Sequence, residues 1–111
     1  MVAVFSKTVT VSPSSTVVEA IAVEDSPRLL RLKKVTVVFP VGTENNLSVV
    51  ILYGNMQVVP DSGSIVGDGV AVPVSANFEF STSEGLKIKA TNADTANSHA
   101  CVVVLECEEV T

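Results

Sequence analysis

The sequence is poor in the side chains that carry most protein chemistry. Among 111 residues it has no tryptophan, one tyrosine, four phenylalanines, one histidine and two cysteines. A structural zinc site takes four ligands of the Cys and His type, which this chain does not contain. Few aromatic rings also leave few platforms on which a sugar or a base could stack. We therefore predict no catalytic residue, no cofactor, no metal site and no enzymatic activity.

Charge is also scarce, since charged residues make up 17% of the chain, against about 25% in typical domains. The net charge is −5, and the one basic cluster is "RLLRLKK", residues 28–34, which argues against nucleic acid as a partner. No apolar run approaches the roughly 18 residues of a membrane span. The N-terminal residues lack the pattern of a signal peptide. We expect a protein made in the cytoplasm, without a membrane partner.

What the chain does have is valine, which dominates a hydrophobic content of 47%. Valine is stiff at χ1 and prefers the pleated surface of a sheet. A small domain, here residues 1–111 taken as one unit, cannot hide this much apolar surface easily. The surplus favours contact with another chain, and the alternative is that several strands are buried on both faces.

Alternation of apolar and polar residues predicts about eight short strands. Turn signals rich in Gly, Pro, Ser and Asn separate them every 8–12 residues. This is the pattern of an all-β fold, an antiparallel β-sandwich of the jelly-roll kind. Nine segments carry strand signals, with a competing helix signal in 16–24, and they cover 5–11, 16–24, 28–40, 47–53, 56–59, 70–74, 77–81, 86–90 and 99–110.

Some of these segments carry competing signals. Thr16 and Glu19 have the spacing of a helix capping box, although the valines and isoleucine around them favour a strand. The apolar phase slips at Lys33 and Lys34, which predicts a β-bulge. The apolar run 47–53 predicts a central strand, and "GN" after it predicts a two-residue hairpin. The proline in "VAVPV", 70–74, places that strand at an edge or a bulge.

The stretch "NSHACVVVLECEEV", residues 97–110, holds the one histidine and both cysteines. On a strand, His99, Cys101 and Cys107 share a face. Six residues of extended chain separate the two cysteines by about 20 Å, so they can share neither a disulfide nor a metal ion. We interpret the stretch as a core strand with two apolar thiols and a histidine at its mouth. An interchain disulfide stays open.

From residue 35 onward the sequence resembles small β-sandwich virion proteins of tailed bacteriophages and archaeal viruses. These have an "FP.G" strand end, an "L.V.I..G" strand, a "Q..P" turn, an "I.GD" turn and a final "N.D...H" segment. The positions that match are Phe39, Pro40, Gly42, Leu47, Val49, Ile51, Gly54, Gln57, Pro60, Ile65, Gly67, Asp68, Asn92, Asp94 and His99.

The resemblance implies a capsid decoration (cement) or turret protein, located on the virion surface and without an active site. Its implied partners are its own copies, as a homotrimer or another homo-oligomer, and the major capsid protein. Residues 1–12 are expected to be an arm or an edge strand that is exchanged with a neighbour. Within it, Val2, Val4 and Phe5 are the expected interchain contacts, because they are apolar and terminal.

Two other classes of function stay open at this point. A ligand- or glycan-binding module would use the glycine-rich segment 61–69 and Tyr53. An enzyme would need His99 or the acidic cluster near the C-terminus as its base.

Overall fold

A computed structural model describes residues 2–110, so that Met1 of the expected arm and Thr111 lie outside the described residues. The described chain folds into eight β-strands and no helix. The strands are β1 (Val2–Val11), β2 (Thr16–Ile21), β3 (Leu29–Phe39), β4 (Leu47–Tyr53), β5 (Met56–Val59), β6 (Val70–Ser81), β7 (Leu86–Asn92) and β8 (His99–Glu109).

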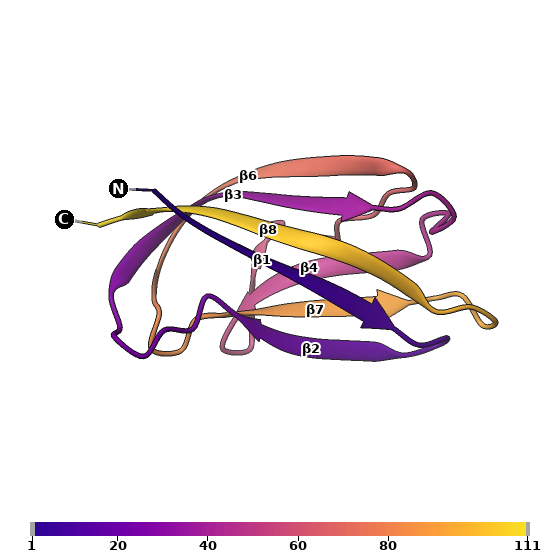
Figure 1. Ribbon diagram of the computed structural model, residues 1–111, viewed down its shortest axis with the longest axis horizontal. Helices are drawn as coiled ribbons and strands as arrows, with labels where there is room; N and C mark the ends of the chain where they lie inside the picture. Colours follow the sequence, from indigo (N-terminus) through magenta and orange to yellow (C-terminus); the bar gives the residue numbers. More distant parts are fainter. Residues whose placement is uncertain (1, 111) are drawn as a thin grey trace.

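The strands form two four-stranded antiparallel sheets that pack face to face (Figure 1). Sheet A has the order β1-β8-β3-β6, and sheet B has the order β2-β7-β4-β5. Strand β1 pairs with β8, β2 with β7, β3 with β6 and β4 with β5, as in one long hairpin wrapped into two layers. This is the jelly-roll arrangement. The predicted all-β sandwich is confirmed.

The structure also settles the ambiguous segments. Residues 16–21 form a strand, so the capping-box spacing does not produce a helix. Strand β4 is central, and Tyr53 pairs with Met56 across the predicted turn, in which Gly54 has a φ of 61°. Pro73 lies in β6, which is an edge strand, where a missing N–H costs no ladder hydrogen bond.

Three predicted boundaries were clearly wrong, among them the end of the second strand, which lies at Ile21 and not at residue 24. The expected strands 70–74 and 77–81 form one continuous strand, β6, because its pairing with β3 resumes on both sides of an irregularity. That irregularity is the predicted bulge: the register of β3 shifts between Leu32 and Lys34 against both β6 and β8. The first strand begins at Val2, three residues before the expected start.

The bulge explains how β3 buries residues of both parities. Leu30 and Leu32 are buried before it, and Val35 and Val37 are buried after it, each 0% exposed. One extra residue relative to β8 turns the side chains by one position, which restores the apolar phase.

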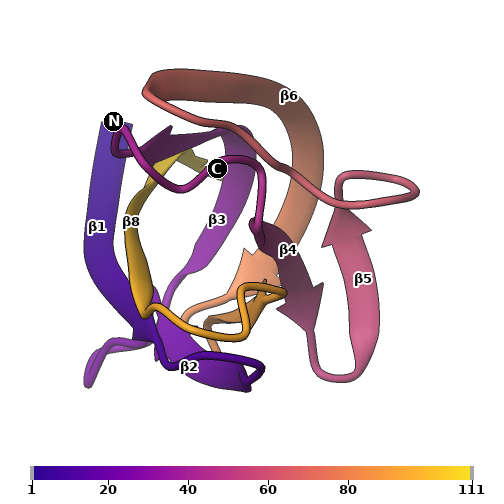
Figure 2. The same cartoon turned by 90° about the vertical axis from the view of Figure 1, so that its right-hand side faces the viewer.

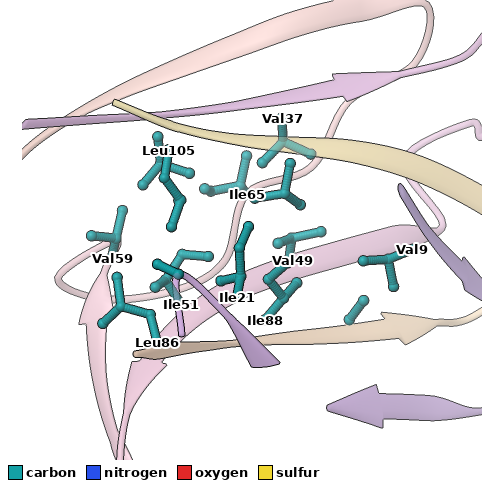
Figure 3. Close-up of a cluster of buried hydrophobic side chains, with 14 of the residues drawn as sticks. Val9, Ile21, Val37, Val49, Ile51, Val59, Ile65, Leu86, Ile88 and Leu105 are labelled. Atoms are coloured by element: carbon teal, nitrogen blue, oxygen red, sulfur yellow. The ribbon is translucent and has the colours of Figure 1, made fainter. Parts of the chain in front are cut away.

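The core lies between the sheets and is built of branched aliphatic side chains from both (Figure 3). Ile65, in the segment between β5 and β6, joins this core and pairs with Val49 through two backbone hydrogen bonds of 2.9 and 2.8 Å. It thereby covers the edge of β4 that the short strand β5 leaves open. The described part of the chain contains no helix of the length and apolarity that a membrane crossing requires.

Candidate interaction surface

The histidine and cysteine stretch is strand β8, as predicted. Cys101 and Cys107 are free thiols, each about 1% exposed, and face the core. Burial raises the pKa of each to about 11, so the reactive thiolate form is suppressed. Neither sulfur can reach a partner chain while β8 stays in place. Within residues 2–110, no cluster of three or more His, Cys, Asp or Glu side chains could hold a metal ion.

The His99 ring belongs to a corner that ties three loops together. Its Nε2 lies 2.8 Å from Oδ2 of Asp94. Asp94 also accepts hydrogen bonds from the N–H groups of Ala96 and Asn97. The bond from Ala96, followed by that from His99, lowers the pKa of Asp94 from 3.8 to about 2. These hydrogen bonds favour the ionised carboxylate and hold it in place, so its role in this loop is structural.

Asn92, buried in the same corner, connects the loops before β2 and β8. Its amide nitrogen donates to the carbonyls of Val11, Ser12 and Asn97 at 3.1, 3.3 and 2.9 Å, and its Oδ1 accepts from the N–H of Asp94. One side chain thus makes hydrogen bonds with four backbone groups.

The "GD" turn has a similar role at the loop that follows β3. Asp68 accepts a hydrogen bond of 2.8 Å from the N–H of Gly42, and backbone hydrogen bonds from Glu44 and Gly42 lower its pKa. Gly67 lies against Phe39, whose ring would be 2.7 Å from an added Cβ. The matching positions Phe39, Gly42, Gly67 and Asp68 therefore hold this loop against the core.

The predicted contacts Val2, Val4 and Phe5 do not share one face. Val2 and Val4 are 70% and 59% exposed, whereas Phe5 points inward and packs against the core. All of β1 pairs with β8 of its own chain, as an edge strand of sheet A. Exchange of this segment with a neighbour stays a prediction.

Sequence reasoning missed a larger surface on the outer side of sheet A. The register puts Thr8, Val102, Val38 and Ala71 in one row across the four strands, and Ser6, Val104, Thr36 and Pro73 in the next. With Thr10 and Ala100 they form a surface without a charge, which we call the uncharged face. We use this name for the residues Ser6, Thr8, Thr10, Thr36, Val38, Ala71, Pro73, Ala100, Val102 and Val104.

The other half of the same outer surface is charged. Lys34 lies 3.9 Å from Glu106, and Arg31 contacts both Glu79 and Glu108. An exposed sheet face of a sandwich is normally polar along its whole length. The signal was present in "TVTV", "VTVV" and "ACVVV", where the outward positions of three strands lack charge together, but only the register brings these runs side by side.

The loops at one end of the sandwich add further exposed valines. Val41 is 89% exposed, and Val66 and Val70 are 43% and 48% exposed. Val41 packs near Gly69, and Val70 pairs with Phe39 beside the uncharged face. These three valines extend the apolar surface around that end.

The two edges of the sandwich differ. On one side Lys7 of β1 points inward, forms an ion pair of 3.3 Å with Glu19 of β2 and donates to the carbonyl of Ala20. An inward charge of this kind protects an edge strand against unwanted pairing. On the other side, β6 and β5 are the edge strands of the two sheets (Figure 2). Residues of both strands line a groove of about 480 Å³.

The features expected for a glycan-binding module do not meet in that groove. Tyr53 is partly buried, and its ring packs edge-to-face on Phe78 with a centroid distance of 5.3 Å. The ring is therefore part of the core boundary and is not an open platform for a sugar.

Comparison with known proteins identifies a fold and no family. No protein-family model and no curated protein matches the sequence. The fold is similar to that of a chain in the atomic structure of Sulfolobus Turreted Icosahedral Virus, with a TM-score of 0.54 and 16% identity. The likeness covers 100% of this chain and 31% of the viral chain, so this chain spans about a third of that protein.

Other solved structures are more distant. FlhE has a TM-score of 0.48 and 11% identity, over 95% of this chain and 96% of its own. A chain of infectious bursal disease virus, Gt strain, has a TM-score of 0.41 and 8% identity, over 94% of this chain and 32% of the viral chain. Scores below 0.5 add nothing to the fold assignment.

Proposed function

We propose that this chain is a non-enzymatic structural protein of a virion, which multimerises and decorates or stabilises a capsid. The observation that carries the proposal is that the whole chain has the fold of part of a chain from an icosahedral virus particle, with a TM-score of 0.54. Its partners are its own copies, as a homotrimer or another homo-oligomer, and the major capsid protein. Its location is the capsid surface.

The uncharged face supports this role through its size. Four strands about 4.8 Å apart and rows about 7 Å apart give it an area on the order of 300–400 Å². Four of its ten residues are Ser or Thr, so only part of this area is apolar. Contiguous apolar patches of a few hundred Å² on a monomer often have a function. A stable pairwise interface buries about 800 Å² on each partner, so this face alone would form only a weak contact. Weak contacts become firm when copies joined in one multimer bind several sites of the same particle at once.

Strand β1 is the second contact region that we propose. Val2 and Val4 lie on the outer side of sheet A, opposite Glu108 and Glu106 of β8. The outer edge of β1 at residues 2–5, which precede the inward Lys7, can add to a neighbour's sheet, with Phe5 anchoring the strand in its own core. Deletion of residues 1–5 should reduce both multimerisation and capsid binding, and unchanged binding would exclude this region.

The proposal is tested with capsids that have been stripped of surface proteins by mild denaturant. The purified chain should rebind them saturably in a sedimentation assay. The double variant V38K/V102K places two charges on the uncharged face and should weaken rebinding at least tenfold. Asn77→Lys, on an exposed position of β6 outside that face, is the matched control and should rebind normally.

Absence of rebinding by the unaltered chain at micromolar concentration would overturn the proposal. Equal rebinding by the double variant and the control would retain the virion role but exclude the uncharged face as the contact.

A further inference from the structure

The outer side of sheet B carries a shallow groove of about 550 Å³, away from the uncharged face of sheet A. It spans β2, β7, β4 and the hairpin that leads to β5. Its lining combines aliphatic side chains with two cations, and includes Val18, Val50, Leu52, Gln57, Lys87 and Lys89.

The register fixes how these side chains alternate across the sheet. Lys89 lies between Val18 of β2 and Val50 of β4, and Lys87 lies next to Leu52 of β4. The two lysines are two positions apart on one strand, so their side chains share a face at a spacing of about 7 Å. Aliphatic stems and neighbours make an apolar floor, and the two ammonium groups stand at its rim.

Among residues 2–110, Lys87 and Lys89 differ from the other Lys and Arg residues in having no carboxylate as an ion-pair partner. The chain has seven Lys and Arg residues. Five of them, Lys7, Arg28, Arg31, Lys33 and Lys34, form ion pairs with carboxylates. Within residues 2–110, Lys87 and Lys89 form none, although the net charge is −5.

We propose that this groove docks an extended, acidic segment of another protein. Carboxylates at alternate positions of such a segment point the same way at the spacing of the two lysines. Apolar side chains of the segment would contact the aliphatic residues Val18, Val50 and Leu52, which lie beside the two lysines on the neighbouring strands. The inference deepens the proposed function, on which it rests only for naming the capsid subunit as the source of the segment.

A second copy of this chain is the less suitable occupant. The chain's own alternate carboxylates on a strand, Glu106 and Glu108, already lie 3.9–4.0 Å from Lys34, Arg31 and Lys33 on sheet A. Docking them on another copy would break these pairs, so that little charge attraction would be gained. A foreign acidic strand has no such cost.

The test uses a synthetic peptide with the sequence Val-Ser-Glu-Ser-Glu-Ser-Val, capped at both ends, and the isotope-labelled full chain. Amide chemical shifts should move along β2, β4 and β7 on titration, and binding should weaken as salt is raised. The double variant K87Q/K89Q should bind about tenfold more weakly, as loss of two exposed ion pairs implies. The variant K33Q/K34Q has the same net charge and should bind like the unaltered chain.

Three results would overturn the inference. They are no chemical-shift change at millimolar peptide, an equal loss of peptide affinity in both double variants, and equal binding of a peptide with Gln in place of Glu.

Binding to anionic phospholipid vesicles that needs Lys87 and Lys89, without peptide binding, would overturn the inference in favour of a membrane surface. If K87Q/K89Q fails with the peptide but rebinds stripped capsids, the inference is supported and the capsid contact lies elsewhere. If the unaltered chain rebinds capsids but not the peptide, the virion role stands and this inference fails.

Discussion

Single polar side chains hold the loops of this sandwich at one end. Every buried side-chain nitrogen or oxygen in the described chain has a hydrogen-bond partner, and Asn92 serves more backbone groups than most. An unpaired buried carbonyl or N–H costs about 1–3 kcal/mol. The corner around Asn92 is therefore the place where one polar substitution should do the most damage.

Asn92→Ala should lower the free energy of unfolding by about 2–4 kcal/mol, because it leaves several backbone groups without their hydrogen-bond partner at once. Urea denaturation followed by circular dichroism measures this loss. Asn77→Ala, at an exposed position of β6, is the control and should change stability by less than about 0.5 kcal/mol. Equal losses in the two variants would contradict the assigned role.

The lowered pKa of Asp94 predicts that the free energy of unfolding falls at acid pH. Its pKa is about 2 in the folded chain, lowered from 3.8 by hydrogen bonds from Ala96, His99 and Asn97. A lowered pKa contributes stability above pH 3.8, and this contribution is lost as the pH falls from there toward 2. Thermal melts between pH 6 and 2 should show a steeper loss for the unaltered chain than for Asp94→Asn. Parallel curves would contradict the assignment.

At the residue scale, the sequence predicted the free cysteines and their shared face but not the ion pair of Lys7 with Glu19. The cysteines follow from alternation along one strand. The ion pair needs β1 and β2 to lie at the same edge of two different sheets, which no local pattern encodes. In the same way, Asn92 was noticed only as part of a motif, since three of its four partners lie 5 to 81 positions away in sequence.

At the scale of elements, strand β3 depends on its bulge. The five buried apolar side chains of this strand lie at even-numbered positions before the bulge and at odd-numbered positions after it. Inserting or deleting one residue therefore turns part of the strand to the other face, unless the change is at the bulge. Deletion of the bulge residue Lys33 would leave all five on one parity against β8.

Deletion of Thr36, three residues later in the same strand, cannot bring all five buried side chains onto one face. Either Val37 and Phe39 turn outward, or Lys34 replaces Val35 in the core. We expect a loss of more than about 3 kcal/mol for this deletion, since burying a lysine or exposing two large apolar side chains costs at least this much. Deletion of Lys33 should cost clearly less. Urea midpoints compare the two, and equal losses would show that the bulge does not set the register.

The same bulge shows why some elements could be predicted and others not. The phase slip at Lys33 and Lys34 was visible, because β3 carries apolar residues on both sides of it. The matching irregularity in β6 was not, because Ser75 and Ala76 fell between the two expected strands 70–74 and 77–81. Pairing with β3 overrides that local signal and makes β6 one strand of 12 residues.

At the scale of the whole molecule, the surplus of valine is only partly explained by the core. Val9, Val11, Val35, Val37, Val49 and Val103 are 0% exposed, so both sheets use valine as a core residue. Other valines lie on the uncharged face, at the loop end and at the start of β1, with Val2 and Val41 exposed by 70% and 89%. This distribution is the physical basis for expecting partners.

Self-association follows from this distribution as an expected outcome. Light scattering over a dilution series should give a mass that is a multiple of 11.6 kDa, with a trimer or higher multimer at the highest concentrations. The V38K/V102K variant should shift the series toward monomer. A monomer at all micromolar concentrations would remove self-assembly from the proposed function.

The most direct test of the virion role is a quantitative mass-spectrometric count of this chain in gradient-purified virus particles from its source. If the proposed virion role is correct, the chain sediments with intact particles in a fixed ratio to the major capsid protein, and mild denaturant releases it before the capsid opens. Its absence from intact particles, while it is abundant in the lysate of the same culture, would exclude that role.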